Sequence, residues 1–128
     1  MATEYWPDFN DLWDYYDPAR TEKVFWELLP QARASGDEAY YLQLMTQIAG
    51  SLSLQKNVEQ AHDILDEVEW QMPGDDIVEV RYLLERGRTY NSAGQPQKAG
   101  PLFKKAVQVA QSISASSAPN PPPGCWSN

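Results

Sequence analysis

The sequence predicts an all-α protein in which about six helices stack as antiparallel pairs. Three observations carry this prediction. Apolar residues recur at helical spacing through most of residues 17–113. Gly, Pro and Asp interrupt that periodicity at short intervals, as they do at helix ends. A pattern of small and large residues also occurs twice with a constant offset of 38 residues, as from Ala49 to Gly87.

Residues 1–16 are rich in aromatic side chains, namely Tyr5, Trp6, Phe9, Trp13, Tyr15 and Tyr16. Asp8 is placed to cap a short helix that reaches Tyr16. The interpretation that we favour is an aromatic N-terminal cap over the first helical hairpin, because an array of helices must cover its ends. The alternative is an aromatic patch that binds a partner, since Trp and Tyr are common binding anchors.

The first long helix is predicted to begin at Asp17-Pro18, with Asp as the N-cap and Pro in the first turn, and to run to about Ala34. Pro30 lies inside it and is expected to kink it or to remove a backbone hydrogen bond. One stripe of this helix is apolar and predicts its buried face: Val24, Phe25, Leu28, Leu29 and Ala32.

A Gly-Asp pair at 36–37 separates this helix from a second one that extends to about residue 54. Asn57 with Gln60 resembles a capping box and predicts a helix that stops at Pro73-Gly74. Its apolar stripe contains Val58, Ala61, Ile64, Leu65 and Val68.

The last two helices are predicted from capping residues and prolines. Asp75 or Asp76 caps a helix that ends at Gly94, and Pro96 starts the next one. Pro101 lies near the first turn of that helix, where proline costs less than in mid-helix.

One spacing occurs on both sides of Gly94, at i, i+4 and i+7. Its residues are Leu83, Gly87 and Tyr90, then Ala99, Phe103 and Ala106. The hairpin resembles the tetratricopeptide repeat (TPR), whose signature is W-x2-L-G-x2-Y followed by A-x3-F and a Pro. Gly87, Tyr90, Ala99 and Phe103 match the signature, whereas Leu83 replaces the Trp, Arg86 the Leu and Gln111 the Pro.

A second copy lies upstream, where Ala49, Leu52, Ala61 and Leu65 take the four matching places. TPR repeats usually recur every 34 residues or so, whereas the two copies here are 38 residues apart. We place the extra residues, about one helical turn, around 69–75. The resemblance to bacterial-type TPR-like proteins implies a right-handed superhelix of antiparallel helix pairs, an α-solenoid. Its domain is 17–113, with repeats at about 42–75 and 80–111.

Net charge, apolar runs and cysteine content exclude some classes of partner and compartment for this protein. The net charge of −8 argues against a nucleic-acid binder, and no apolar run approaches the roughly 18 residues of a membrane span. Cys125 is the single cysteine, which fits a reducing compartment. We therefore expect a cytoplasmic protein with neither nucleic acid nor membrane as a partner.

Charge is distributed unevenly: residues 59–79 contain only acids among their charged residues, whereas residues 80–128 are basic. The acidic stretch is interpreted as a solvated helix face. The alternative is a bipolar particle whose basic last hairpin binds acidic peptides, or pairs head to tail with a second copy.

Catalytic motifs are missing from the sequence. Glu59 and His62 form a Glu-x-x-His string, but a di-iron site of that type needs two such strings and the chain has one His. The spacing of His62 and Asp66, i and i+4 on a helix, would allow the two side chains to hold a metal weakly. We expect instead that His62 is an ordinary surface histidine. No Gly-rich phosphate loop, Ser nucleophile elbow or zinc spacing occurs. No enzymatic activity, cofactor or metal is therefore expected.

The TPR resemblance implies a concave groove that binds a peptide or protein segment. The family's groove positions correspond to Gln43, Thr46, Gly50 and Ser53 in one repeat and to Arg81, Leu84, Arg88 and Asn91 in the other. Arg81 and Arg88 are hypothesised to bind a carboxylate or an acidic peptide; the alternative is an ordinary solvated face. Thr46 and Gly50 stand where the chaperone-binding members carry Lys and Asn, so that carboxylate clamp is not expected.

The last helix carries more apolar surface than one neighbour covers, at Leu102, Phe103, Ala106, Val107 and Ala110. No polar capping helix follows it, and residues 114–128 form a Ser/Pro-rich tail that is predicted to be flexible. The predicted function is a non-catalytic binding or scaffold module for a protein or peptide partner. The alternative is a structural protein that dimerises through this last helix.

Overall fold

The computed structural model describes residues 7–72 and 74–117, which form six helices and no strand. The helices are α1 (Phe9–Leu12), α2 (Pro18–Ala34), α3 (Glu38–Leu54), α4 (Val58–Gln71), α5 (Asp76–Ser92) and α6 (Pro96–Ser117). The predicted all-α class is therefore confirmed for the described part of the chain.

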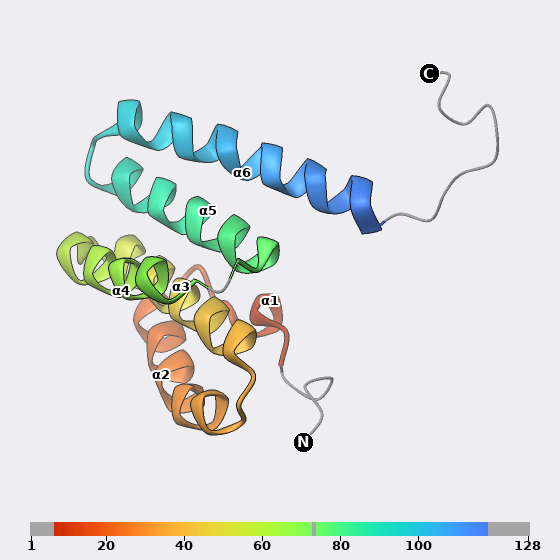
Figure 1. The fold of residues 1–128 in the computed structure, drawn as a ribbon. Coiled ribbons are helices and arrows are strands. Elements are labelled where there is room, and N and C mark those ends of the chain that lie inside the picture. The colour runs from red at the N-terminus through yellow and green to blue at the C-terminus, as the bar shows by residue number, and fades with distance from the viewer. Residues whose placement is uncertain (1–6, 73, 118–128) are drawn as a thin grey trace.

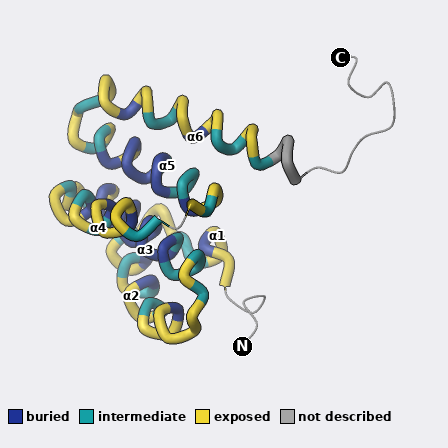
Figure 2. The backbone as a smooth tube through the Cα atoms, viewed as in Figure 1, coloured by how far each residue is buried: buried dark blue, intermediate teal, exposed yellow. Residues whose placement is uncertain are grey.

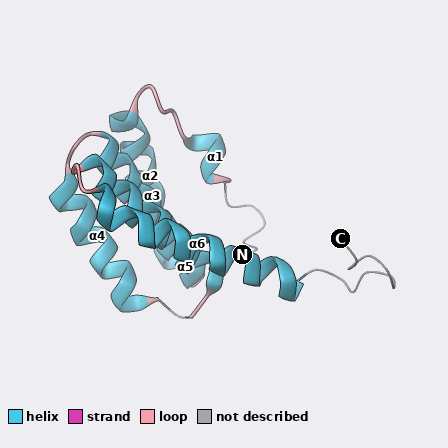
Figure 3. Cartoon of the chain, turned by 90° about the horizontal axis from the view of Figure 1, so that it is seen from above, coloured by secondary structure: helices cyan, strands magenta, loops and turns pink. Residues whose placement is uncertain are grey.

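The long helices form one stack in which each contacts the next along the chain (Figure 1). α3 and α5 each contact three other long helices, and those packed against α3 are α2, α4 and α5. α3 is correspondingly buried along most of its length (Figure 2). α1 lies beside the stack rather than within it (Figure 3). α3 and α5 together thus form the centre of the described chain, with α2 packed on α3 and α6 on α5.

Asp residues begin the helices as predicted. The Asp17 carboxylate accepts a hydrogen bond from the Arg20 amide at 3.1 Å, and Asp37 accepts one from the Tyr40 amide at 3.1 Å. The Asp75 carboxylate accepts from two amides at the start of α5. Each carboxylate satisfies backbone N–H groups that have no partner inside the helix.

The capping box predicted for α4 is wrong. Asn57 is the N-cap residue, but its side chain makes no capping hydrogen bond. Its backbone N–H, which Gln60 would satisfy in a capping box, donates instead to the Leu52 carbonyl at 2.9 Å. Lys56 precedes it with φ +68°, so the tight turn out of α3 already satisfies this group.

Two helix ends also differ from the prediction. Asp8 caps α1, but the helix ends at Leu12 rather than at Tyr16. The chain becomes extended at Trp13, and the amide of Asp14 bonds to the Thr21 hydroxyl at 3.0 Å instead of continuing the helix. At the other end, α6 runs to Ser117, so the tail boundary predicted at 114 falls inside this helix. Residues 118–128 lie outside the described residues.

α5 and α6 approach closely at Gly87. A Cβ atom added there would lie 2.6 Å from the Phe103 ring, whereas one added at Gly100 on the outer side of α6 would meet nothing within 4 Å. We expect Gly87→Ala to lower the free energy of unfolding by about 1 kcal/mol, because crowding outweighs the gain in helix propensity. Gly100→Ala, the matched control, should raise it by about 0.5–1 kcal/mol. Urea unfolding of both variants checks this; equal stabilisation would mean that α5 and α6 are not in close contact.

Candidate functional site

The predicted groove residues lie on α3 and α5, and these two helices contact each other. We call this surface the α3–α5 face. Its α5 members range from half-buried Arg81 and Leu84 to exposed Arg88 and Asn91. Its α3 members are more covered than an open groove predicts: Gln43 is half-buried, and Thr46, Gly50 and Ser53 are buried. Part of that cover comes from residues 7–16, which pack along α3.

Phe9 is the first anchor of this N-terminal segment, and only 4% of its surface is exposed. Its ring stacks on Tyr40 of α3 with 4.9 Å between centroids, and meets Phe25 of α2 edge-on at 6.2 Å. The Arg81 guanidinium of α5 lies 5.0 Å from the Phe9 centroid, within cation–π distance. One side chain of the segment therefore contacts three long helices.

Trp13 is the second anchor. Its indole Nε1–H donates to the Gln47 side-chain oxygen at 2.8 Å, and its ring meets Phe25 edge-on at 5.6 Å. Gly50 lies beside the indole: a Cβ atom there would be in ordinary van der Waals contact with the Trp13 ring at 3.5 Å, but would come within 2.6 Å of the Glu85 carboxylate. Tyr15 stacks on the outer face of the indole at 4.8 Å.

The segment follows one stripe of α3. Tyr40, Gln47 and Gly50 contact it in succession, and their spacing of i, i+7 and i+10 places them on one side of the helix. At the start of the stripe, the Tyr40 hydroxyl donates to the Pro7 carbonyl at 2.8 Å. Burial, followed by the negative charge of Asp8, raises the pKa of Tyr40 to about 12, so this hydroxyl remains a donor at physiological pH.

A hollow of about 190 Å³ opens beside Trp13, between α3 and α5. The residues that line it are Trp13, Tyr15, Gly50, Ser53, Leu54, Glu85 and Arg88. Glu85 is 3% exposed, and burial raises its pKa to about 6 although the Arg88 charge opposes the shift. Its carboxylate pairs with the Arg88 guanidinium at 2.5 Å, while Arg88 itself remains exposed. The hollow therefore joins an aromatic wall to a buried acid and an accessible cation.

Arg86 forms a separate polar cluster between α4 and α5. Its guanidinium donates to the Asp66 carboxylate at 2.6 Å and to the Tyr82 hydroxyl at 3.2 Å, and it lies 2.8 Å from Nδ1 of His62. The expectation of a surface histidine is therefore wrong, because His62 is half-buried in this cluster. Burial, then the Arg86 charge, lowers the pKa of His62, which favours the neutral imidazole, the form that can accept a hydrogen bond from Arg86 at Nδ1.

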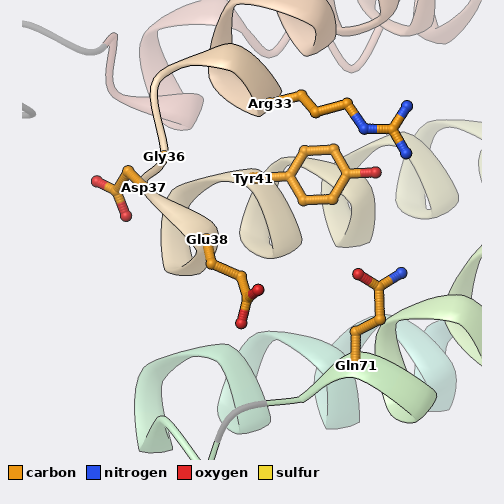
Figure 4. A pocket seen from close by; sticks show the side chains of 6 residues that line it. All are labelled: Arg33, Gly36, Asp37, Glu38, Tyr41 and Gln71. Atoms are coloured by element: carbon orange, nitrogen blue, oxygen red, sulfur yellow. The ribbon is translucent and has the colours of Figure 1, made fainter.

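A second hollow, of about 230 Å³, lies where α2 ends and α3 begins (Figure 4). It is lined by Arg33, Gly36, Asp37, Glu38, Tyr41 and Gln71. The Arg33 guanidinium lies 5.6 Å from the Tyr41 ring centroid. Its ionisable lining groups are of both signs, and no partner chemistry is favoured over another.

The five residues predicted for self-association mostly face α5. Ala106 is buried, Phe103 lies against Gly87, and Leu102 packs against the core. Ala110 is half-buried, whereas Val107 is 54% exposed. The apolar surface that the sequence leaves without a neighbour is therefore smaller than predicted for the described part of α6.

No group of three or more His, Cys, Asp or Glu side chains is placed to hold a metal ion in 7–72 and 74–117. None of the helices in the same residues is both long and apolar enough to span a membrane. No family model, curated protein or solved structure matches the chain.

Sequence reasoning did not identify several polar residues of these clusters, among them Gln47, Tyr82, Glu85 and Arg86. Arg86 stands where the TPR signature has an apolar Leu. A charged side chain on a buried helix face needs a buried polar partner, so this position could have predicted the polar cluster. Glu85 gave no such signal, since burial of its carboxylate depends on how closely α3 approaches α5 at Gly50.

Proposed function

We propose that this chain is a non-catalytic, TPR-like binding or scaffold module. In this proposal α3 and α5 line the concave groove of a right-handed superhelix, and the groove takes a peptide or protein segment. The observation that carries the proposal is that residues 7–16 already lie along α3 as a short stretch of polypeptide with two aromatic anchors, of which Phe9 is buried and Trp13 half-buried. A face that accommodates its own chain in this way has the shape and the polar partners that a foreign segment needs.

The proposed location is the cytoplasm, on the sequence grounds given above. Rigid helices favour a binding role because the face is formed before the ligand arrives, so little ordering entropy is lost on binding. The dimer alternative receives less support, since Val107 is the large apolar side chain of the described part of α6 that remains exposed.

Selection of binders from a displayed random peptide library tests this function. High display valency retains weak binders, so the full-length wild type is the target. Enriched peptides should bind the wild type and Lys104→Ala alike and lose at least roughly tenfold affinity for Arg88→Ala, an interface loss of about 1.4 kcal/mol. Arg88 and Lys104 are both exposed cations, on α5 and α6 respectively, which makes them a matched pair.

Circular dichroism of the three proteins first establishes that their helix content agrees. Enriched peptides that bind all three proteins equally would place the binding surface elsewhere. A selection that enriches nothing would contradict a peptide-binding role.

A further inference from the structure

We infer that residues 7–16 are a tethered ligand of the α3–α5 face, and that the partner of this face is a protein segment of the same chemistry. That chemistry is a short acidic stretch with two aromatic residues four positions apart. The inference rests on the proposed function and specifies the class of its ligand.

The anchors have the geometry of a bound peptide. Trp13 is four positions after Phe9, at the end of the single turn of α1. The two rings therefore project to the same side of that turn. Both rings meet Phe25 edge-on, which places them at the two ends of one aromatic site. The Gln47 side chain gives the second anchor a directional hydrogen bond in addition to apolar contact. Aromatic rings that are buried, as Phe9 is, or half-buried and fixed by a hydrogen bond, as Trp13 is, are typical of binding hot spots.

Charge favours an acidic occupant. The segment carries Asp8, Asp11 and Asp14 and contains no Lys or Arg. The receiving face supplies cations at both anchors: Arg81 lies over the Phe9 ring, and Arg88 lines the hollow beside Trp13. Opposite charges on ligand and receptor raise the rate of encounter and disfavour basic competitors.

Residues 7–16 are packed less closely around Trp13 than the side chains of the core are packed against one another. Hollows of about 190 Å³ and 270 Å³ both include Trp13 in their linings. The first extends toward α5, and the second is lined by Arg20, Thr21 and Val24 of α2. Trp13 is half-buried and lies between these two hollows, which open to the surface, so this end of the segment is the one from which it can exchange.

The experiment uses a fluorescently labelled peptide of residues 7–16 and the full-length chain. The peptide is titrated into the wild type and into the double variant Phe9→Ala/Trp13→Ala, in which the tethered anchors are removed. Saturable binding is expected for the double variant. The wild type should bind roughly 10–100-fold more weakly, because its own segment competes at a local concentration of about millimolar.

Two control peptides test the proposed chemistry. One carries Ala in place of Phe9 and Trp13, and the other carries Lys in place of Asp8, Asp11 and Asp14. Neither should bind the double variant at concentrations that saturate the native peptide. Equal binding of either control would overturn the assignment of an acidic, two-anchor ligand.

A second preparation covers the case in which the double variant does not fold. A protease site is inserted between Tyr15 and Tyr16, which are both exposed, and is cleaved after the chain has folded. The labelled peptide should then replace the released segment. Absence of saturable binding to both preparations would overturn the inference. Library peptides that are basic, yet lose affinity for Arg88→Ala, would also overturn it while leaving the peptide-binding function in place.

Discussion

Replacing Arg86 by alanine is expected to lower the free energy of unfolding by about 3 kcal/mol. The side chain is 8% exposed and bridges α4 and α5 through Asp66 and Tyr82. Its loss leaves a gap in the helix interface and removes the donor that faces His62. Denaturant unfolding followed by circular dichroism measures the change.

Arg33→Ala provides the matched control. Arg33 also lies over a tyrosine ring, at 5.6 Å from Tyr41, but it is exposed and its loss should cost less than about 1 kcal/mol. The pKa of His62, followed by NMR, should also rise in Arg86→Ala, because the Arg86 charge is one cause of its lowering. Equal losses in the two variants, with an unchanged His62 pKa, would contradict a bridging role for Arg86.

Glu85→Gln is expected to stabilise the protein at pH 8 by about 2 kcal/mol. Burial raises the pKa of Glu85 from 4.5 to about 6, which means that the folded state prefers the neutral acid. The stability that this group contributes is complete below pH 4.5 and is lost as the pH rises through about 6. The free energy of unfolding of Glu85→Gln, relative to the wild type, should therefore increase between pH 4.5 and about pH 6 and remain constant at higher pH.

The measurement is the free energy of unfolding of wild type and variant between pH 4 and pH 8. Glu59→Gln, at an exposed position on α4, serves as the control and should change stability by less than about 0.5 kcal/mol at every pH. Destabilisation by Glu85→Gln at pH 8 would show that the ion pair with Arg88 outweighs the cost of burying the carboxylate.

The helices could be predicted because their signals are local. Asp17, Asp37 and Asp75 cap helices by bonding amides two or three residues away, and the apolar stripes follow from the helical period. The capping box at Asn57 failed because a neighbouring helix end had already satisfied the group in question. Prediction from local pattern therefore succeeded where the partner group was near in sequence.

The candidate site was predicted only in part. The spacing of Arg81 and Arg88 placed both on one face of α5. The contact of Arg81 with Phe9 is tertiary, and the Glu85 that pairs with Arg88 within α5 is buried only because α3 packs against it. Phe9 reaches α2, α3 and α5 together, and no periodicity within residues 1–16 contains that information. The cover over Thr46 and Ser53 was missed for the same reason.

Chemical-shift mapping of the isotope-labelled wild type tests the central claim most directly. Unlabelled peptide of residues 7–16 is added until the tethered segment is displaced. We expect the amide signals of Gly50, Ser53 and Arg81 to shift, and the signal of the Trp13 indole N–H to leave its hydrogen-bonded position. Shifts confined to α6, or none at millimolar peptide, would contradict a binding role for the α3–α5 face.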